Sequence, residues 1–227
     1  MGTLLITILP SLLIVTFFVM SDRFPEPTNQ IVKIFFYGIL LCFPAFYLNS
    51  ALIGVYANTG ISDGLISSFL SAAPIEEVLK FTVLYSLVYK MKDFNEPIDG
   101  VVYGVTVSLG FATLENIYYV YVLSDYFDTS SQSLAILRSF SAIPAHGVFG
   151  AIMGYFFMKY SFVSKQNNLA LCMIVPILLH GSYNFFAHTY FIVSLLIVII
   201  SWVVVLRSFS RLKKSQKTKK REYEKKV

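Results

Sequence analysis

The sequence predicts an all-α, polytopic membrane protein, a bundle of about seven transmembrane helices. The composition points to this class, because 56% of the 227 residues are hydrophobic and only 14% are charged, whereas water-soluble chains carry charge on about a quarter of their residues. The apolar residues also gather in runs of about 20, the length that a helix needs to cross a bilayer. This apolar content argues against intrinsic disorder, and two cysteines are too few for a disulfide-stapled secreted domain.

Seven apolar runs are separated by polar loops, and we expect each run to be one span. Their approximate limits are 3–20, 31–55, 63–89, 98–122, 136–158, 168–187 and 189–206. The first run has no basic start and no small-residue cleavage site, so it differs from a signal peptide. Spans four and five carry small residues at every fourth position, among them Gly100, Gly104, Gly150 and Gly154. This spacing predicts a close approach of helix backbones.

The lysine and arginine residues of the loops predict the orientation of the chain. The loops after spans one, three and five contain Arg23, then Lys90 and Lys92, then Lys159 and Lys165, while the loops after spans two, four and six contain none. Basic loops stay in the cytoplasm. We therefore expect the N-terminus outside the cell and the C-terminus in the cytoplasm.

The distribution of charge also divides the chain into two parts. Residues 1–206 are expected to form the membrane domain, and residues 207–227 a basic cytoplasmic tail with 10 Lys or Arg and 2 Glu. Such a tail fixes orientation and contacts anionic lipid. Since charge alone does not indicate nucleic-acid binding, the lipid bilayer is the expected partner of this tail.

Polar side chains lie inside four of the spans, where burial in hydrocarbon makes each a functional candidate. They are Glu76, Glu77 and Lys80 in span three, Glu115 and Asn116 in span four, His146 in span five, and His180 and Asn184 in span six. At a rise of about 1.5 Å per residue, the glutamates and histidines fall at overlapping depths in the outer half of the membrane. We expect one shared cavity that opens toward the outside, and an ion pair between Glu76 and Lys80 at i and i+4.

This layer contains the groups that peptide hydrolysis needs, namely a base that activates water and donors that hold the oxyanion. Glu76 or Glu77 can be the base, and His146, His180 and Asn184 can polarise the carbonyl group. A glutamate-activated water is the preferred mechanism and needs no cofactor. Zinc bound by Glu77, His146 and His180 is the alternative, although the sequence contains no HExxH motif.

Other classes of protein use the same types of residue. A proton-coupled transporter would use them as a proton relay, and an immunity-type membrane protein would bind a partner without cleaving it. A scaffold would need Glu76 and Lys80 only as a buried ion pair. The sequence shows no inverted repeat of the kind found in many transporters, which favours hydrolysis.

Five segments surround these residues. They are Pro74–Lys80 (PIEEVLK), Asp99–Gly104 (DGVVYG), Leu109–Asn116 (LGFATLEN), Ala145–Gly147 (AHG) and Leu179–Phe185 (LHGSYNF). In this order and spacing they closely resemble the PrsW intramembrane proteases of Gram-positive bacteria. The resemblance covers about residues 65–190.

The resemblance implies a multi-pass enzyme of the bacterial cell membrane. Such an enzyme performs site-1 cleavage of a single-pass, membrane-anchored anti-sigma factor on the extracytoplasmic side, and so activates an extracytoplasmic-function sigma factor under envelope or antimicrobial-peptide stress. The residues that carry over as catalytic are Glu76, Glu77, Glu115, His146 and His180, with Lys80, Asn116 and Asn184 in support. Asn184 stands where the family often has Asp, and the choice between a glutamate-type and a metal-type mechanism stays open.

Overall fold

A computed structural model describes residues 2–56, 59–164 and 168–224, and every regular element in that part of the chain is helical. The longer helices are α1 (Gly2–Ser21), α2 (Thr28–Tyr56), α4 (Ala73–Ser86), α5 (Pro97–Tyr121), α7 (Ala142–Met158), α8 (Asn168–Thr189) and α9 (Phe191–Glu224). The shorter elements are α3 (Asp63–Leu65), α6 (Ser131–Phe140), the π-helical segments Ile66–Ala72 and Lys159–Val163, and the 3-10 turns Val88–Lys90 and Asp125–Phe127. The all-α prediction is confirmed.

Six helical stretches of the described chain are long and apolar enough to cross a membrane. They are Gly2–Ser21, Thr28–Tyr56, Pro97–Tyr121, Ser131–Val163, Asn168–Ala187 and Phe191–Gln216. The seventh expected span, 63–89, is helical from Asp63 to Ser86, but its first part is π-helical and its second part carries three charged side chains. The chain is therefore a multi-pass membrane protein with six to seven membrane-length helices.

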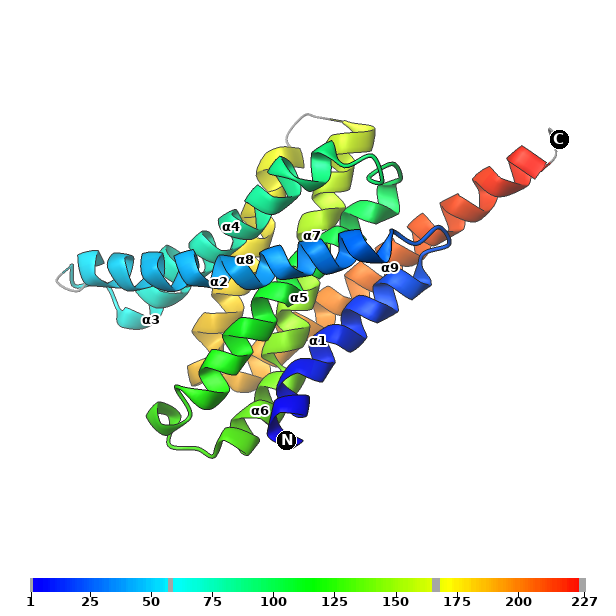
Figure 1. Cartoon of the computed structure of the whole chain (residues 1–227). Helices are drawn as coiled ribbons and strands as arrows, with labels where there is room; N and C mark the ends of the chain where they lie inside the picture. Colours follow the sequence, from blue (N-terminus) through cyan, green and yellow to red (C-terminus); the bar gives the residue numbers. More distant parts are fainter. Residues whose placement is uncertain (1, 57–58, 165–167, 225–227) are drawn as a thin grey trace.

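The expected span 136–158 is divided in the structure, where α6 and α7 meet at a bend. At Ser141 the backbone leaves the helical region, with φ −122° and ψ −71°. Pro144 explains the bend, because a proline has no N–H to donate to the carbonyl four residues earlier and its ring crowds that group. The bend turns α6 across the end of the bundle, as Figure 1 shows.

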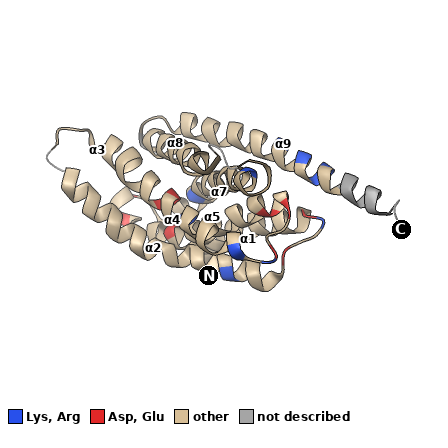
Figure 2. Cartoon of the chain, turned by 90° about the horizontal axis from the view of Figure 1, so that it is seen from above, with Lys and Arg blue, Asp and Glu red and all other residues tan. Residues whose placement is uncertain are grey.

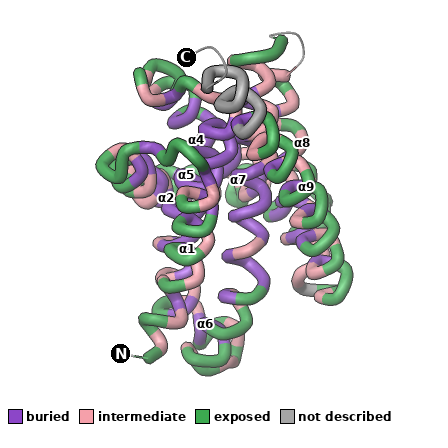
Figure 3. Tube along the Cα trace, turned by 90° about the vertical axis from the view of Figure 1, so that its right-hand side faces the viewer, coloured by how far each residue is buried: buried purple, intermediate pink, exposed green. Residues whose placement is uncertain are grey.

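Helices α5 and α7 form the centre of the bundle. In α5, 89% of the most apolar stretch is buried, compared with 22% in α1 and in α9, and Figure 3 shows the same contrast. A Cβ atom added to Gly154 would overlap the carbonyl oxygen of Gly100, and one added to Gly104 would overlap that of Gly150. The predicted small-residue ridges thus face each other and bring the two backbones into contact.

The bundle has two distinct ends (Figure 1), and the N-terminus and α6 lie at one of them. At the other end, the Gln216 Nε2 of α9 donates hydrogen bonds to Asp22 Oδ1 and Glu96 Oε2, both at 2.8 Å. The loops after α1 and α4 therefore meet the base of the basic tail, which agrees with the predicted alternation of loops. Lys165, which belongs to the third basic loop, lies outside the described residues.

Candidate active site

A cavity of about 260 Å³ lies inside the bundle. The helices around it are α2, α5, α6, α7, α8 and α4 with the π-helical segment that precedes α4. Its walls come from the later halves of α2, α5 and α8 and from the first turns of α4 and α7, so it lies toward the end of the bundle that carries α6 (Figure 1). Residues from expected spans three to six therefore meet at one cavity. The main polar side chains that line it are Asn49, Glu76, Glu115, Arg138, His146 and Asn184.

Glu76 presents a carboxylate oxygen without a hydrogen-bond partner. Its Oε2 forms no hydrogen bond although it is buried; it lies 4.0 Å from His180 Nε2 and 3.8 Å from Lys80 Nζ. The other oxygen, Oε1, accepts a long hydrogen bond of 3.5 Å from Asn49 Nδ2. Buried carboxylate oxygens are normally hydrogen-bonded. The Oε2 of Glu77 also forms no hydrogen bond, but Glu77 does not line the cavity, whereas Glu76 does. Glu76 is thus the glutamate that can take up a water molecule or a metal ion in this cavity.

Glu77 points away from the cavity and is held by two partners. Its Oε1 accepts hydrogen bonds from Lys80 Nζ and from His180 Nδ1, both at 2.8 Å, and its side chain is completely buried. The expected pair of Glu76 and Lys80 is present at 3.8 Å, but Glu77 is the closer partner of the ammonium group. Because a carboxylate only accepts, His180 carries a proton on Nδ1, which it donates to Glu77.

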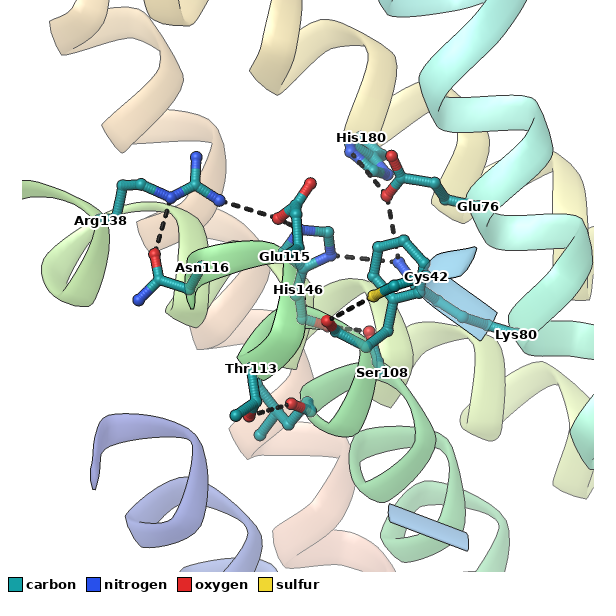
Figure 4. Close-up of polar contacts among 12 residues, drawn as sticks. Cys42, Glu76, Lys80, Ser108, Thr113, Glu115, Asn116, Arg138, His146 and His180 are labelled. Atoms are coloured by element: carbon teal, nitrogen blue, oxygen red, sulfur yellow. Dashed lines mark hydrogen bonds and ion pairs between the residues drawn. The ribbon is translucent and has the colours of Figure 1, made fainter. Parts of the chain in front are cut away.

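His146 lies between a cation and an anion. Its Nδ1 is 3.1 Å from Lys80 Nζ, and its Nε2 is 3.0 Å from Glu115 Oε2. An ammonium group has no lone pair to accept with, so the network assigns the ring proton of His146 to Nε2, which donates it to Glu115. Figure 4 shows this ring between the two charged groups.

Arg138 completes the site and was not among the residues predicted from the sequence. Its Nη2 donates to Glu115 Oε2 at 2.8 Å and its Nε to Asn116 Oδ1 at 2.7 Å. Asn116 in turn donates to the Thr7 carbonyl at 2.9 Å, and it lies outside the cavity wall. Asn116 therefore joins α1 to the site through Arg138. Figure 2 shows acidic positions within the bundle, beside α4.

Two sequence signals could have pointed to the missed residues. Arg138 lies within the expected span 136–158, and Asn49 lies within the expected span 31–55. Near the end of a span, however, arginine usually extends toward the membrane surface. Only the bend before α7 shows that Arg138 turns inward.

The donor set fits a zinc ion, with one change from the set that the sequence predicted. Ligand atoms of Glu76, His146 and His180 all lie within 4.8 Å of one another, and two imidazoles with one carboxylate suit zinc. Glu76 takes the place of Glu77 because Glu77 is turned away and bonds the second nitrogen of His180, the supporting contact that metal-bound histidines usually have. Both nitrogens of His146 have partners, so metal binding requires that one of them be released.

A multi-pass helical bundle that buries carboxylates and imidazoles around a cavity is the arrangement expected of an intramembrane peptidase. The chain belongs to the PrsW family, because the family described as "PrsW family intramembrane metalloprotease" matches residues 26–208. It is 36% identical over 178 residues to a "Protease PrsW" of Geobacillus kaustophilus, covering 77% of this chain and 75% of that protein.

Two further relatives agree. A "Protease PrsW" of Bacillus subtilis is 36% identical over 182 residues, with 78% of this chain and 79% of the relative covered. One of Oceanobacillus iheyensis is 31% identical over 209 residues, with 90% and 93% covered. No solved structure matches the chain. The family membership makes this chain a peptidase of the membrane and sets aside the transporter and scaffold alternatives.

Proposed function

We propose that this chain performs site-1 cleavage of a single-pass, membrane-anchored anti-sigma factor on the extracytoplasmic side of the bacterial cell membrane. The cut would activate an extracytoplasmic-function sigma factor under envelope or antimicrobial-peptide stress. The family supports the peptidase part of this proposal. The resemblance of the motifs supports the substrate, and the basic loops at the end of the bundle opposite the cavity support the side of cleavage.

The observation that carries the mechanism is the unpartnered Oε2 of Glu76 in the cavity. Glu76 takes the proton of a water molecule, and the resulting hydroxide adds to the peptide carbonyl. The C–N bond then breaks as the leaving amine takes the proton from Glu76. Asn184 lines the same cavity and supplies a neutral donor for the oxyanion. Glu77 and Lys80 support the reacting groups. Glu77 holds His180 in position, and Lys80 holds His146.

Zinc chemistry is a second candidate, favoured by the family description and by the Glu76, His146 and His180 group. These three residues would hold the ion, and Glu77 would orient His180 from behind. Bound zinc polarises a carbonyl group and lowers the pKa of a bound water molecule. In either mechanism Glu76 is the residue that the reaction cannot lose.

The test is cleavage by the purified full-length chain in liposomes, with each single-pass anti-sigma factor of the same bacterium as substrate. The proposal expects one of them to be cut in its extracytoplasmic segment, as mapped by mass spectrometry of the products. Cleavage that survives chelation supports glutamate-activated water, and loss on chelation with recovery on added zinc supports the metal. No cut in any of these substrates, or a cut only on the cytoplasmic side, contradicts the proposal.

The side of cleavage needs an independent measure of orientation. The two native cysteines, Cys42 and Cys172, are buried, so an introduced thiol can be labelled selectively. Tyr126 is 81% exposed beside α6, and Arg23 is exposed in the loop after α1. A membrane-impermeant maleimide applied to whole cells should label Tyr126→Cys and leave Arg23→Cys unlabelled until the membrane is opened.

A further inference from the structure

Three neighbours hold the guanidinium group of Arg138, two by hydrogen bonds and one by contact with its flat face. Its Nε and Nη2 donate to Asn116 and Glu115, and its guanidinium carbon lies 3.8 Å from the centre of the Tyr119 ring. Within the described part of the chain, Nη1 forms no hydrogen bond. A planar guanidinium fixed in this way presents its remaining N–H groups in one direction.

A second cavity, of about 330 Å³, adjoins the first at this side chain. Both cavities are lined by Ser67, Ala72, Tyr119, Arg138, Tyr183 and Asn184. The rest of its wall is more apolar, with Phe127, Leu134, Leu137, Phe185, Ala187 and Phe191 beside Ser68, Ser141 and Thr189. Arg138 therefore stands on the boundary between the reacting cavity and a second cavity with a larger apolar wall.

The charge around Arg138 selects a neutral ligand. Its guanidinium is already paired with Glu115. The reacting cavity and the layer of side chains behind it together hold three glutamates and two cations, Lys80 and Arg138. An acidic ligand would be repelled by this excess of carboxylate, whereas a neutral carbonyl oxygen accepts a hydrogen bond from Nη1 without adding charge. An extended peptide offers such carbonyl groups along its backbone.

We propose that Arg138 is a substrate-binding residue whose Nη1 donates a hydrogen bond to a main-chain carbonyl of the peptide that is cut. The bound segment is extended and uncharged, runs from the reacting cavity into the second cavity, and places an apolar side chain there. This inference rests on the proposed peptidase function and assigns the chemistry of the segment that the enzyme recognises.

The test separates binding from cleavage. In nanodiscs, the Glu76→Gln chain, which lacks the base, is titrated with fluorescent single-pass peptides made from the anti-sigma factors of the same bacterium. Adding Arg138→Lys or Arg138→Gln should weaken binding about tenfold, the effect of losing one hydrogen bond to a charged donor. Replacing the apolar residues beside the cut with Asp should also weaken binding. Arg23→Lys, at an exposed arginine far from the site, is the matched control and should bind unchanged.

Kinetics give a second readout in the cleaving chain. Arg138→Lys should raise KM about tenfold and change kcat less than threefold. A role limited to supporting Glu115 would instead lower kcat at constant KM, and that result overturns the proposal. The Arg138→Lys variant keeps a cation beside Glu115. The unfolding temperature of this variant shows whether it folds like the wild type.

The binding and cleavage assays also distinguish failure of the Arg138 proposal from failure of the proposed function. Equal binding by the Arg138 variants, or binding by none of the peptides, overturns the proposal for Arg138. If the peptides bind in an Arg138-dependent way but the wild-type chain cleaves none of them, the proposed function fails while the binding role stands.

Discussion

Glu76 and Glu77 are neighbours in the sequence but have different surroundings. Consecutive helix positions point about 100° apart, so only one of the two carboxylates can face the cavity. Glu77 binds Lys80 and His180 and is fully buried. Each residue has an Oε2 that forms no hydrogen bond, but only Glu76 lines the cavity. The structure thus gives the two carboxylates separate roles, one in supporting the site and one in the reaction.

Replacing Glu77 should lower stability as well as activity. In Glu77→Gln, the buried ammonium of Lys80 loses its closest counter-ion, and breaking a buried ion pair costs about 3–5 kcal/mol. We expect the free energy of unfolding in detergent to fall by that order. Glu76→Gln should unfold close to the wild type, because the Oε2 of Glu76 has no hydrogen bond to lose and Glu77 remains as the closer partner of Lys80.

The double variant Glu77→Gln/Lys80→Met is the matched control. Removing the ammonium group together with its closest partner leaves no unpaired buried cation, so most of the lost stability should return. Cleavage should stay low, because His180 lacks the carboxylate that orients it. A double variant that is as unstable as the single one would contradict the pairing.

At the scale of elements, the contact between α5 and α7 depends on glycines that no other residue can replace. Gly154→Ala would place a methyl group against the carbonyl of Gly100, and overpacking of this kind costs about 1–3 kcal/mol. Gly54→Ala in α2 meets no atom within 4 Å and is the control. We expect a lower unfolding temperature for the first variant and an unchanged or slightly higher one for the second.

The sequence predicted the helical class and the approximate spans because long apolar runs have few alternatives in a bilayer. It did not predict the division of span 136–158, although Pro144 was a local signal, because prolines also occur within continuous membrane helices. It identified the motif residues, yet not that Glu76 rather than Glu77 faces the cavity. Hydropathy and spacing predict the angle between two side chains on one helix. The rotation of that helix about its own axis, which decides which side chain faces the cavity, depends on tertiary packing.

At the scale of the whole molecule, an acidic cluster joins the loops opposite the active site. Burial raises the pKa of Asp22 above its ordinary value of 3.8, against the hydrogen bond from Gln216, which lowers it. Burial also raises the pKa of Glu26. The folded chain therefore binds these protons more tightly than the unfolded chain does.

This cluster predicts how stability depends on pH. Since the folded state keeps its proton to higher pH, the free energy of unfolding should fall as pH rises from 3.8 through the raised folded pKa of Asp22. Asp22→Asn should raise the unfolding temperature at pH 7 and make the fall with pH shallower. Asp125→Asn, at an exposed position, should match the wild type. An identical pH dependence in Asp22→Asn would show that this carboxyl group does not contribute.

The most direct test of the central claim, that Glu76 activates the attacking water, is the cleavage rate in liposomes of the wild type, Glu76→Gln and Glu26→Gln. Glu26 is also a buried glutamate, hydrogen-bonded to Tyr103 at the far end of the bundle, so it controls for the loss of a buried carboxylate. We expect Glu26→Gln to cleave at close to the wild-type rate and Glu76→Gln to be slower by about a hundredfold or more, with both variants folded. A folded Glu76→Gln chain that cleaves as fast as the wild type would contradict the account.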